Sequence, residues 1–277
     1  MRYALNLPPF GALADVRTLA ELANAAEDAG WDGFFIWDHI QTEPSMPVVD
    51  PWVALAAMAM TTERIRLGAL VTPLGRRRPS KLARETATLD QLSRGRLIVG
   101  VGSGSDQWYH EYSALGEPTD AKTLAAMLDE GLDVLTGLWR GEPFSHAGPH
   151  YTVNHARFLP TPVQTPRIPI WVGGQWPNKS PMRRAARWDG VCPGVEGGFI
   201  QPEQVREVVA YIQRQRTSDA PFDVVVTGYV GEMPPAEAEA RLRSYADAGV
   251  TWWQEGFWWS DTPDDVHKRI QQGPPAV

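Results

Sequence analysis

The segment from Ile65 to Gly104 constrains the fold most, because it contains a complete strand–helix–strand unit. Ile65 to Val71 and Leu97 to Val101 are continuous apolar runs, as expected for parallel strands that are buried on both faces. Between them a helix can begin at Pro79, whose missing N–H costs nothing there, and residues at three- and four-residue spacing give it one apolar stripe. The segment therefore predicts a right-handed βαβ unit of a parallel α/β protein.

Strand and helix signals alternate along the rest of the chain in the same way. We expect strands at 2–7, 33–37, 65–71, 97–101, 168–172, 190–193, 222–229 and 251–255, and helices at 15–29, 51–62, 79–92, 120–139, 181–188, 202–216, 235–248 and 263–272. Eight repeats without a linker favour one (β/α)8 TIM barrel over two doubly wound halves, so residues 1–277 are predicted to form a single domain. A proline- and glycine-rich stretch, about 141–168, is too long for a simple loop. It predicts an ordered insertion between the fourth helix and the fifth strand.

Composition narrows the function classes. A net charge of −7 disfavours a nucleic-acid surface, and no run reaches the 18 apolar residues of a membrane span. The single cysteine, Cys192, excludes an internal disulfide and any cysteine-based zinc cluster, and it favours a reducing, cytoplasmic compartment. The N-terminus shows no signal-peptide pattern, and the six histidines show no metal-ligand spacing. The expected partner is a small-molecule substrate, with no metal.

The active site of such a barrel lies at the carboxyl ends of its strands. The second strand ends in Trp37-Asp38-His39, and an imidazole there can exchange a proton with a ligand near neutral pH. Alternation along the strand places Trp37 and His39 on one face and Asp38 on the other. Asp38 then meets a cofactor while His39 meets the substrate, unless a break at Asp38 brings both inward. The alternatives are a structural histidine and an aspartate that caps a turn.

Two glycine-rich turns follow the fourth and fifth strands. Gly102-Ser103-Gly104-Ser105 and Gly173-Gly174 offer unobstructed backbone N–H groups, which suit a phosphate, although glycine also serves plain tight turns. Arg76-Arg77-Arg78 could grip an anionic tail, but a run of charges is more often a solvated face, and we favour that interpretation.

The chain has 12 tryptophans, several of them at predicted strand ends. Either they fill the core, or they form a wall around a flat apolar ligand. Trp37, Trp176 and Trp258 are the candidates for a substrate-binding wall, and we expect 257–259 to roof the pocket. Because Trp252 and Trp253 are consecutive in a strand, only one of them can face the barrel interior.

Four long motifs make the chain resemble the bacterial luciferase-like oxidoreductases: GWDGFFIWDH (30–39), LGALVTPLGRRRPSKLARETATLDQLSRGRLIVGVGSG (67–104), FLPTPVQTPRIPIWVGG (158–174) and ARWDGVCPG (186–194). This family includes monooxygenases that use reduced FMN and dehydrogenases or reductases that use the deazaflavin coenzyme F-420. The resemblance covers most of the chain and implies a (β/α)8 barrel with a flavin or deazaflavin ring across the strand ends. Related barrels commonly dimerise, so a homodimer is expected.

The resemblance also implies roles for individual residues. Asp38 and His39 match the acid–base and cofactor-facing position of the deazaflavin branch. A non-prolyl cis peptide is expected near Ala69-Leu70, with Thr72 facing the ring. The two glycine-rich turns, 102–105 and 173–174, match positions near the cofactor and its phosphate, and Asn6 at the end of the first strand is a further cofactor candidate.

One position departs from the family pattern. Deazaflavin-dependent sugar-phosphate dehydrogenases carry a glutamate where this chain has Ser105, which argues against the same dehydrogenation but not against the cofactor. We predict an oxidoreductase that uses FMN or coenzyme F-420 for hydride transfer or monooxygenation of a small organic substrate. The alternative is a non-catalytic flavin-binding protein of the same fold.

Overall fold

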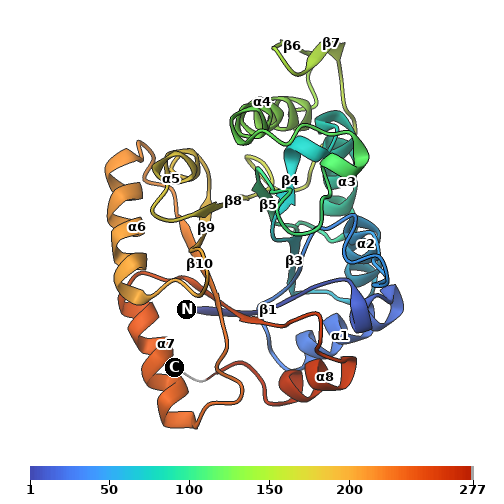
Figure 1. Ribbon diagram of the computed structural model, residues 1–277. Helices are drawn as coiled ribbons and strands as arrows, with labels where there is room; N and C mark the ends of the chain where they lie inside the picture. The colour runs from blue at the N-terminus through green and yellow to red at the C-terminus, as the bar shows by residue number, and fades with distance from the viewer. Residues whose placement is uncertain (276–277) are drawn as a thin grey trace.

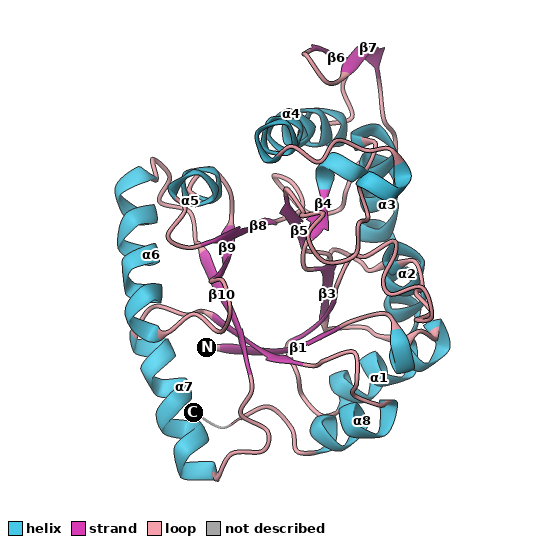
Figure 2. Ribbon diagram, viewed as in Figure 1, coloured by secondary structure: helices cyan, strands magenta, loops and turns pink. Residues whose placement is uncertain are grey.

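Parallel strands line a nearly closed barrel, and helices surround it (Figures 1 and 2). The computed structural model describes residues 1–275 and confirms the predicted TIM-barrel class. Within those residues the strands are β1 (Arg2–Leu7), β2 (Gly33–Ile36), β3 (Arg66–Ala69), β4 (Thr72–Pro73), β5 (Val99–Gly102), β8 (Ile170–Gln175), β9 (Gly190–Gly194), β10 (Asp223–Gly228) and β11 (Trp252–Gly256). Their order is β3-β2-β1-β11-β10-β9-β8-β5-β4.

The third strand of the barrel is interrupted. The sequence predicts one strand over 65–71, but the structure has β3 and β4 with a cis peptide bond between Leu70 and Val71. The cis peptide thus lies one bond beyond the position expected from the resemblance. β3 pairs with β2, β4 pairs with β5, and a bridge between Leu67 and Leu97 brings the two edges of the sheet together.

The helices lie where the sequence predicts them, within a few residues. They are α1 (Val16–Asp28), α2 (Pro51–Thr61), α3 (Pro79–Leu92), α4 (Ala121–Trp139), α5 (Lys179–Ala185), α6 (Pro202–Gln215), α7 (Pro235–Asp247) and α8 (Pro263–Gln271), with 3-10 turns at Gly11–Leu13, Leu74–Arg76 and Ser113–Leu115. Asp15 and Asp120 accept hydrogen bonds from the backbone N–H groups of Thr18 and Thr123, as N-caps do. No helix among residues 1–275 is long and apolar enough to cross a membrane.

The 141–168 stretch contains an antiparallel hairpin, β6 (Phe144–Ala147) and β7 (Thr152–Ala156), which projects beyond α4 (Figure 1). Glu130 on α4 fastens the hairpin: it contacts His146 Nε2 at 3.0 Å and accepts from the backbone N–H groups of His150 and Tyr151. The insertion is therefore ordered and packed on the helical layer.

The apolar side chains form two layers, one inside the barrel and one between the strands and the helices. Phe35, Trp171 and Trp252 pack against one another inside the barrel, at centroid distances of 5.4–6.0 Å. Trp253 faces outward and packs on Tyr245. This confirms that only one of the two consecutive tryptophans faces the interior.

Candidate active site

His39 follows β2 and stands at the barrel mouth, as its place in the sequence predicts. Its side chain is 25% exposed, and its Nδ1 lies 2.8 Å from Oε2 of Glu111. Rings from three segments surround the imidazole, with centroid distances of 5.5 Å to Phe10, 6.1 Å to Trp37 and 5.3 Å to Tyr109. The imidazole is thus held in place on one side and remains accessible on another.

Glu111 is the residue of the candidate site that the sequence analysis missed. It lies in the loop between β5 and α4, is 4% exposed, and also accepts from the backbone N–H groups of Ile40 (2.7 Å) and Gln41 (3.4 Å). Burial raises the pKa of this carboxyl, but the hydrogen bond from His39, the nearby charge of Arg76 and the Ile40 N–H outweigh burial and hold the pKa below its usual range. An ionised Glu111 orients His39, and no strand-end pattern marks it in the sequence.

Asp38 directly precedes His39, but β2 ends at Ile36, so the strand alternation used to predict its direction does not reach it. Its carboxylate is fully buried and accepts from Trp52 Nε1 (3.2 Å), Arg77 Nη2 (2.6 Å) and Arg76 Nη2 (3.4 Å). This corrects the expectation of a solvated face at Arg76 and Arg77. The oxygens of Asp38 are committed to these donors, and the catalytic and cofactor-binding roles expected of Asp38 stay predictions.

Three buried polar side chains sit at the barrel mouth with unused hydrogen-bonding atoms. Asn6 Nδ2 and Thr227 Oγ1 both donate to Gln254 Oε1, at 3.2 and 3.0 Å. Asn6 Oδ1, Gln254 Nε2 and Thr72 Oγ1 have no hydrogen-bond partner in the part of the chain that the structure describes, although these residues are at most 6% exposed. Buried polar atoms are normally paired. One acceptor, one donor and one hydroxyl are therefore available to a ligand.

The turn after β5 has an open backbone but a structural role as well. Gly104 has a φ of +74°, and a Cβ there would overlap the hydroxyl of Tyr112, which donates to the Ser103 carbonyl at 3.0 Å. Gly102 ends β5, and a Cβ there would lie 2.8 Å from Val71. Ser105 is exposed, and its hydroxyl accepts from Gln107 N–H at 3.2 Å. Direct cofactor contact by this turn stays a prediction.

The turn predicted at Gly173-Gly174 is instead part of β8, where Gly173 pairs with Cys192 and Gly174 with Pro193 of β9. A Cβ at Gly173 would lie 3.0 Å from Val71, whereas a Cβ at Gly174 would overlap Pro181 at the start of α5. Gly174 therefore serves close helix packing, and a bulky residue there would test packing as much as phosphate binding. Ala69 and Leu70 are buried, and Leu70 belongs to the interior core.

The predicted tryptophan wall is only partly present. Trp176 is 7% exposed and donates to Glu207 on α6 at 3.1 Å, so it lies in the outer layer and does not line the barrel mouth. Phe257 is also buried there. Trp37 is partly exposed beside His39, and Trp258 is 43% exposed, stacks on Tyr229 at 5.9 Å and lines a cavity of about 640 Å³ beside α8.

Known proteins resemble the chain in sequence and in fold. It is 34% identical over 200 residues to the coenzyme F-420-dependent glucose-6-phosphate dehydrogenase of Beutenbergia cavernae, which covers 70% of this chain and 57% of that protein. The coenzyme F-420-dependent tetrahydromethanopterin reductase of Methanopyrus kandleri superposes with a TM-score of 0.79 at 19% identity, covering 98% and 96% of the two chains. The oxygenating constituent of 3,6-diketocamphane monooxygenase of Pseudomonas putida, in complex with FMN, superposes with a TM-score of 0.77 at 17% identity, covering 98% and 96%.

The luciferase-like monooxygenase family matches residues 4–272, almost the entire chain. Members of this family are oxidoreductases and monooxygenases that depend on F-420 or FMN, which confirms the enzyme class predicted from the motifs. The chain belongs to the luciferase-like monooxygenase family.

Proposed function

We propose that this protein transfers hydride between coenzyme F-420 and a small organic substrate at the barrel mouth, with His39 as the proton-transfer residue. The observation that carries the proposal is the 2.8 Å contact between His39 and the buried Glu111. When a hydride leaves or joins a carbon that is bonded to oxygen or nitrogen, that oxygen or nitrogen also loses or gains a proton. An accessible, oriented imidazole can carry this proton. The 34% identity to an F-420-dependent enzyme supports F-420 over FMN.

The barrel mouth fits a flavin-type ring. The unused atoms of Asn6, Thr72 and Gln254 offer an acceptor, a hydroxyl and a donor, and a flavin or deazaflavin carries carbonyl and N–H groups on one edge of its ring. A cavity of about 300 Å³ opens beside them at the ends of β8, β9 and β10, and Gly194 leaves part of its lining without a side chain. The bound cofactor would supply the hydride chemistry, while the protein supplies position and electrostatics.

His39 can act as base or acid only in one of its tautomers. The ionised Glu111 accepts from Nδ1–H, which leaves Nε2 free to accept a proton from a substrate or, once protonated, to return it. Arg76 links Asp38 to Glu111 and so helps to hold Glu111 against His39. Its Nη2 lies 3.0 Å from the Asp38 carbonyl oxygen and 3.5 Å from Glu111 Oε1.

The first test is a titration of the full chain with F-420 and with FMN, together with a Thr72→Val variant. The Thr72 hydroxyl has no partner within residues 1–275, so its isosteric removal should leave the melting temperature unchanged or raise it. If the hydroxyl meets the cofactor, affinity should fall about three- to tenfold, or about 1 kcal/mol. The control, Thr88→Val on the exposed side of α3, should change neither quantity.

The second test is His39→Asn, which cannot carry a proton. We expect unchanged cofactor affinity and a loss of at least about a hundredfold in kcat, within the usual range for acid–base catalysis. Tighter binding of FMN than of F-420 would refute the cofactor assignment. Redox turnover of the bound cofactor that is unaffected by His39→Asn would remove His39 from the reaction, and no turnover at all would favour the non-catalytic alternative.

Support for a homodimer comes from α2. Residues 51–60 of this helix carry no polar side chain, yet Val53 and Met60 are 61% and 69% exposed. A helix that is apolar all round is normally buried, so a second copy is the expected cover. We propose a cytoplasmic homodimer, and Met60→Glu should shift the molar mass by light scattering to that of a monomer if α2 is the interface.

A further inference from the structure

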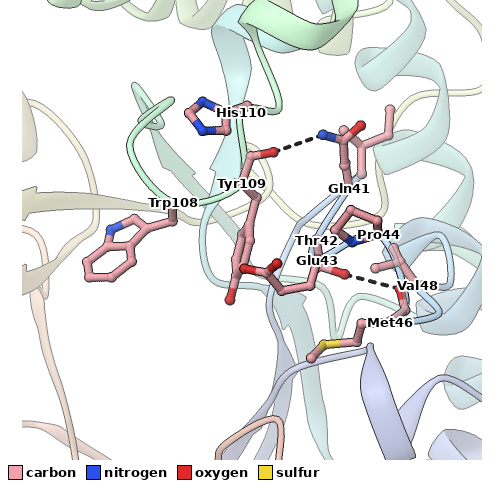
Figure 3. A pocket seen from close by; sticks show the side chains of 10 residues that line it. Gln41, Thr42, Glu43, Pro44, Met46, Val48, Trp108, Tyr109 and His110 are labelled. Atoms are coloured by element: carbon pink, nitrogen blue, oxygen red, sulfur yellow. Dashed lines mark hydrogen bonds between the residues drawn. The ribbon is translucent and has the colours of Figure 1, made fainter.

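A third cavity, of about 570 Å³, opens near His39. It lies between the β2–α2 loop and the β5–α4 loop and is lined by the side chains in Figure 3, at positions 40–44, 46, 48 and 108–110. Gln41 Nε2 donates to the Tyr109 carbonyl at 2.9 Å and ties the two loops together. The volume is sufficient for a small organic molecule.

One residue of the cavity lining, Tyr109, also contacts His39, the proposed proton-transfer residue. Tyr109 packs edge-on against His39 at a centroid distance of 5.3 Å and also lines the cavity, and Ile40 follows His39 directly. A molecule that occupies the cavity therefore contacts two residues, Ile40 and Tyr109, that adjoin His39. These contacts make the cavity a candidate substrate subsite for the proposed reaction.

The lining carries one carboxylate, on Glu43, and no lysine or arginine. Its one histidine, His110, lies 3.8 Å from a carboxylate oxygen of Asp106, so a negative charge already faces that imidazole. Glu43 is exposed and forms no ion pair with any residue in 1–275. Burial and the negative charges of Glu43 and Glu111 raise the pKa of the Tyr109 hydroxyl, so this group stays protonated and neutral. The nearest guanidinium groups, on Arg76 and Arg77, are engaged by Asp38.

The remaining lining includes two aromatic side chains, Trp108 and Tyr109, and the thioether of Met46. Trp108 is 74% exposed, and Figure 3 shows the Tyr109 ring beside Glu43 with the Met46 thioether below them. Aromatic faces attract cations, and a carboxylate without a partner adds to that attraction. A phosphate or carboxylate would meet no lysine or arginine in this lining, and its one imidazole, on His110, already faces Asp106.

We propose that this cavity selects an amine-bearing substrate with an apolar or aromatic body and excludes phosphate esters and other anions. The inference rests on the proposed function for the role of His39, but the binding preference follows from the cavity alone. It sets this chain apart from its dehydrogenase relative, whose named substrate is a sugar phosphate.

The test is a set of binding titrations with benzylammonium, benzyl alcohol and benzoate, which share one ring and differ in charge. They are measured by calorimetry on the full chain, with saturating cofactor and without it. We expect benzylammonium to bind at least about tenfold more tightly than benzoate, with benzyl alcohol between them. Glu43→Gln should remove the preference of the cation over the alcohol and leave the alcohol unchanged, and Glu43→Lys should reverse the order.

Two controls separate the cavity from general effects. Glu142→Gln, an exposed carboxylate in the insertion, should change none of the three affinities. Trp108→Ala should weaken all three probes, and benzylammonium at least as much as the others, because it removes a ring face that attracts cations without changing the charge of the lining. Equal affinities for the three probes, a preference for benzoate, or no binding of any probe up to its solubility would overturn the proposal. Because these titrations need no turnover, a failure here is distinguishable from a failure of cofactor binding or of His39→Asn.

Discussion

Replacing Glu111 by glutamine tests the center of the proposed site with a change of only one functional group. In the native protein Oε2 meets His39 Nδ1 at 2.8 Å and Oε1 accepts from Ile40 N–H at 2.7 Å. Glutamine can keep both contacts only if its oxygen faces Ile40 and its NH2 group faces His39. The imidazole must then accept at Nδ1 and carry its proton on Nε2.

The expected cost follows from the change in these two contacts. Hydrogen bonds to a charged group contribute about 1.5–3 kcal/mol, whereas neutral ones contribute about 0.5–1.5 kcal/mol. Because the side chain of Glu111 is only 5% exposed, solvent screens little of this difference. Two weakened contacts give a loss of about 2 kcal/mol in the free energy of unfolding at pH 7, which urea denaturation can measure.

The pH dependence of the unfolding free energy distinguishes loss of the Glu111 charge from a change in packing, because a packing effect does not depend on the ionisation of Glu111. The pKa of Glu111 is lowered in the folded protein, so its ionised form stabilises the fold above the unfolded value of about 4.3. This contribution is lost as the pH falls through the lower, folded value. The difference between native protein and Glu111→Gln should therefore be largest near neutral pH and shrink in acid.

Activity gives the second measurement. With the proton on Nε2, His39 cannot accept one from the substrate, so kcat should fall about a hundredfold while KM and cofactor affinity change little. The control is Asp106→Asn in the same loop, which accepts from Tyr112 and Ser113 N–H and does not touch His39. It should cost some stability and leave kcat intact. Equal unfolding free energies at every pH, together with unchanged kcat in Glu111→Gln, would refute the reasoning.

Three further substitutions test the surrounding structure. Gly104→Ala should cost about 1–3 kcal/mol in unfolding free energy, because φ is +74° and the new methyl group overlaps the Tyr112 hydroxyl. Asp38→Asn should cost about 3–5 kcal/mol, since it removes the negative charge that faces the buried Arg76 and the partly buried Arg77 guanidinium groups. Trp258→Ala should raise KM for the substrate and barely change cofactor affinity; if only the melting temperature falls, the Trp258 ring is structural.

Elements with local causes were predictable from the sequence. Asp15, Asp120 and Pro79 mark helix starts that the structure confirms. Strand alternation says less about Trp37, Asp38 and His39, because β2 ends at Ile36. The alternation could not say what Asp38 meets, because Arg76 and Arg77 lie 38 and 39 positions later in the chain. Likewise, the apolar pattern of 65–71 predicts a strand but contains no signal for its interruption at Leu70.

Neither the role of Glu111 nor the cavity near it was predicted from the sequence, and the physical reason is the same for both. Both depend on the way the β5–α4 loop folds back over the β2–α2 loop, and a contact between residues 72 positions apart leaves no periodic trace in either segment. His39 is predictable because a buried strand fixes its position, whereas its partner and the cavity lining come from loops. The same division bears on function. In the proposed reaction a strand end holds the group that transfers the proton, and exposed loop residues set the charge that the substrate must carry. Glu43 and Trp108, both exposed and both in those loops, are therefore the positions at which specificity can change without disturbing the barrel.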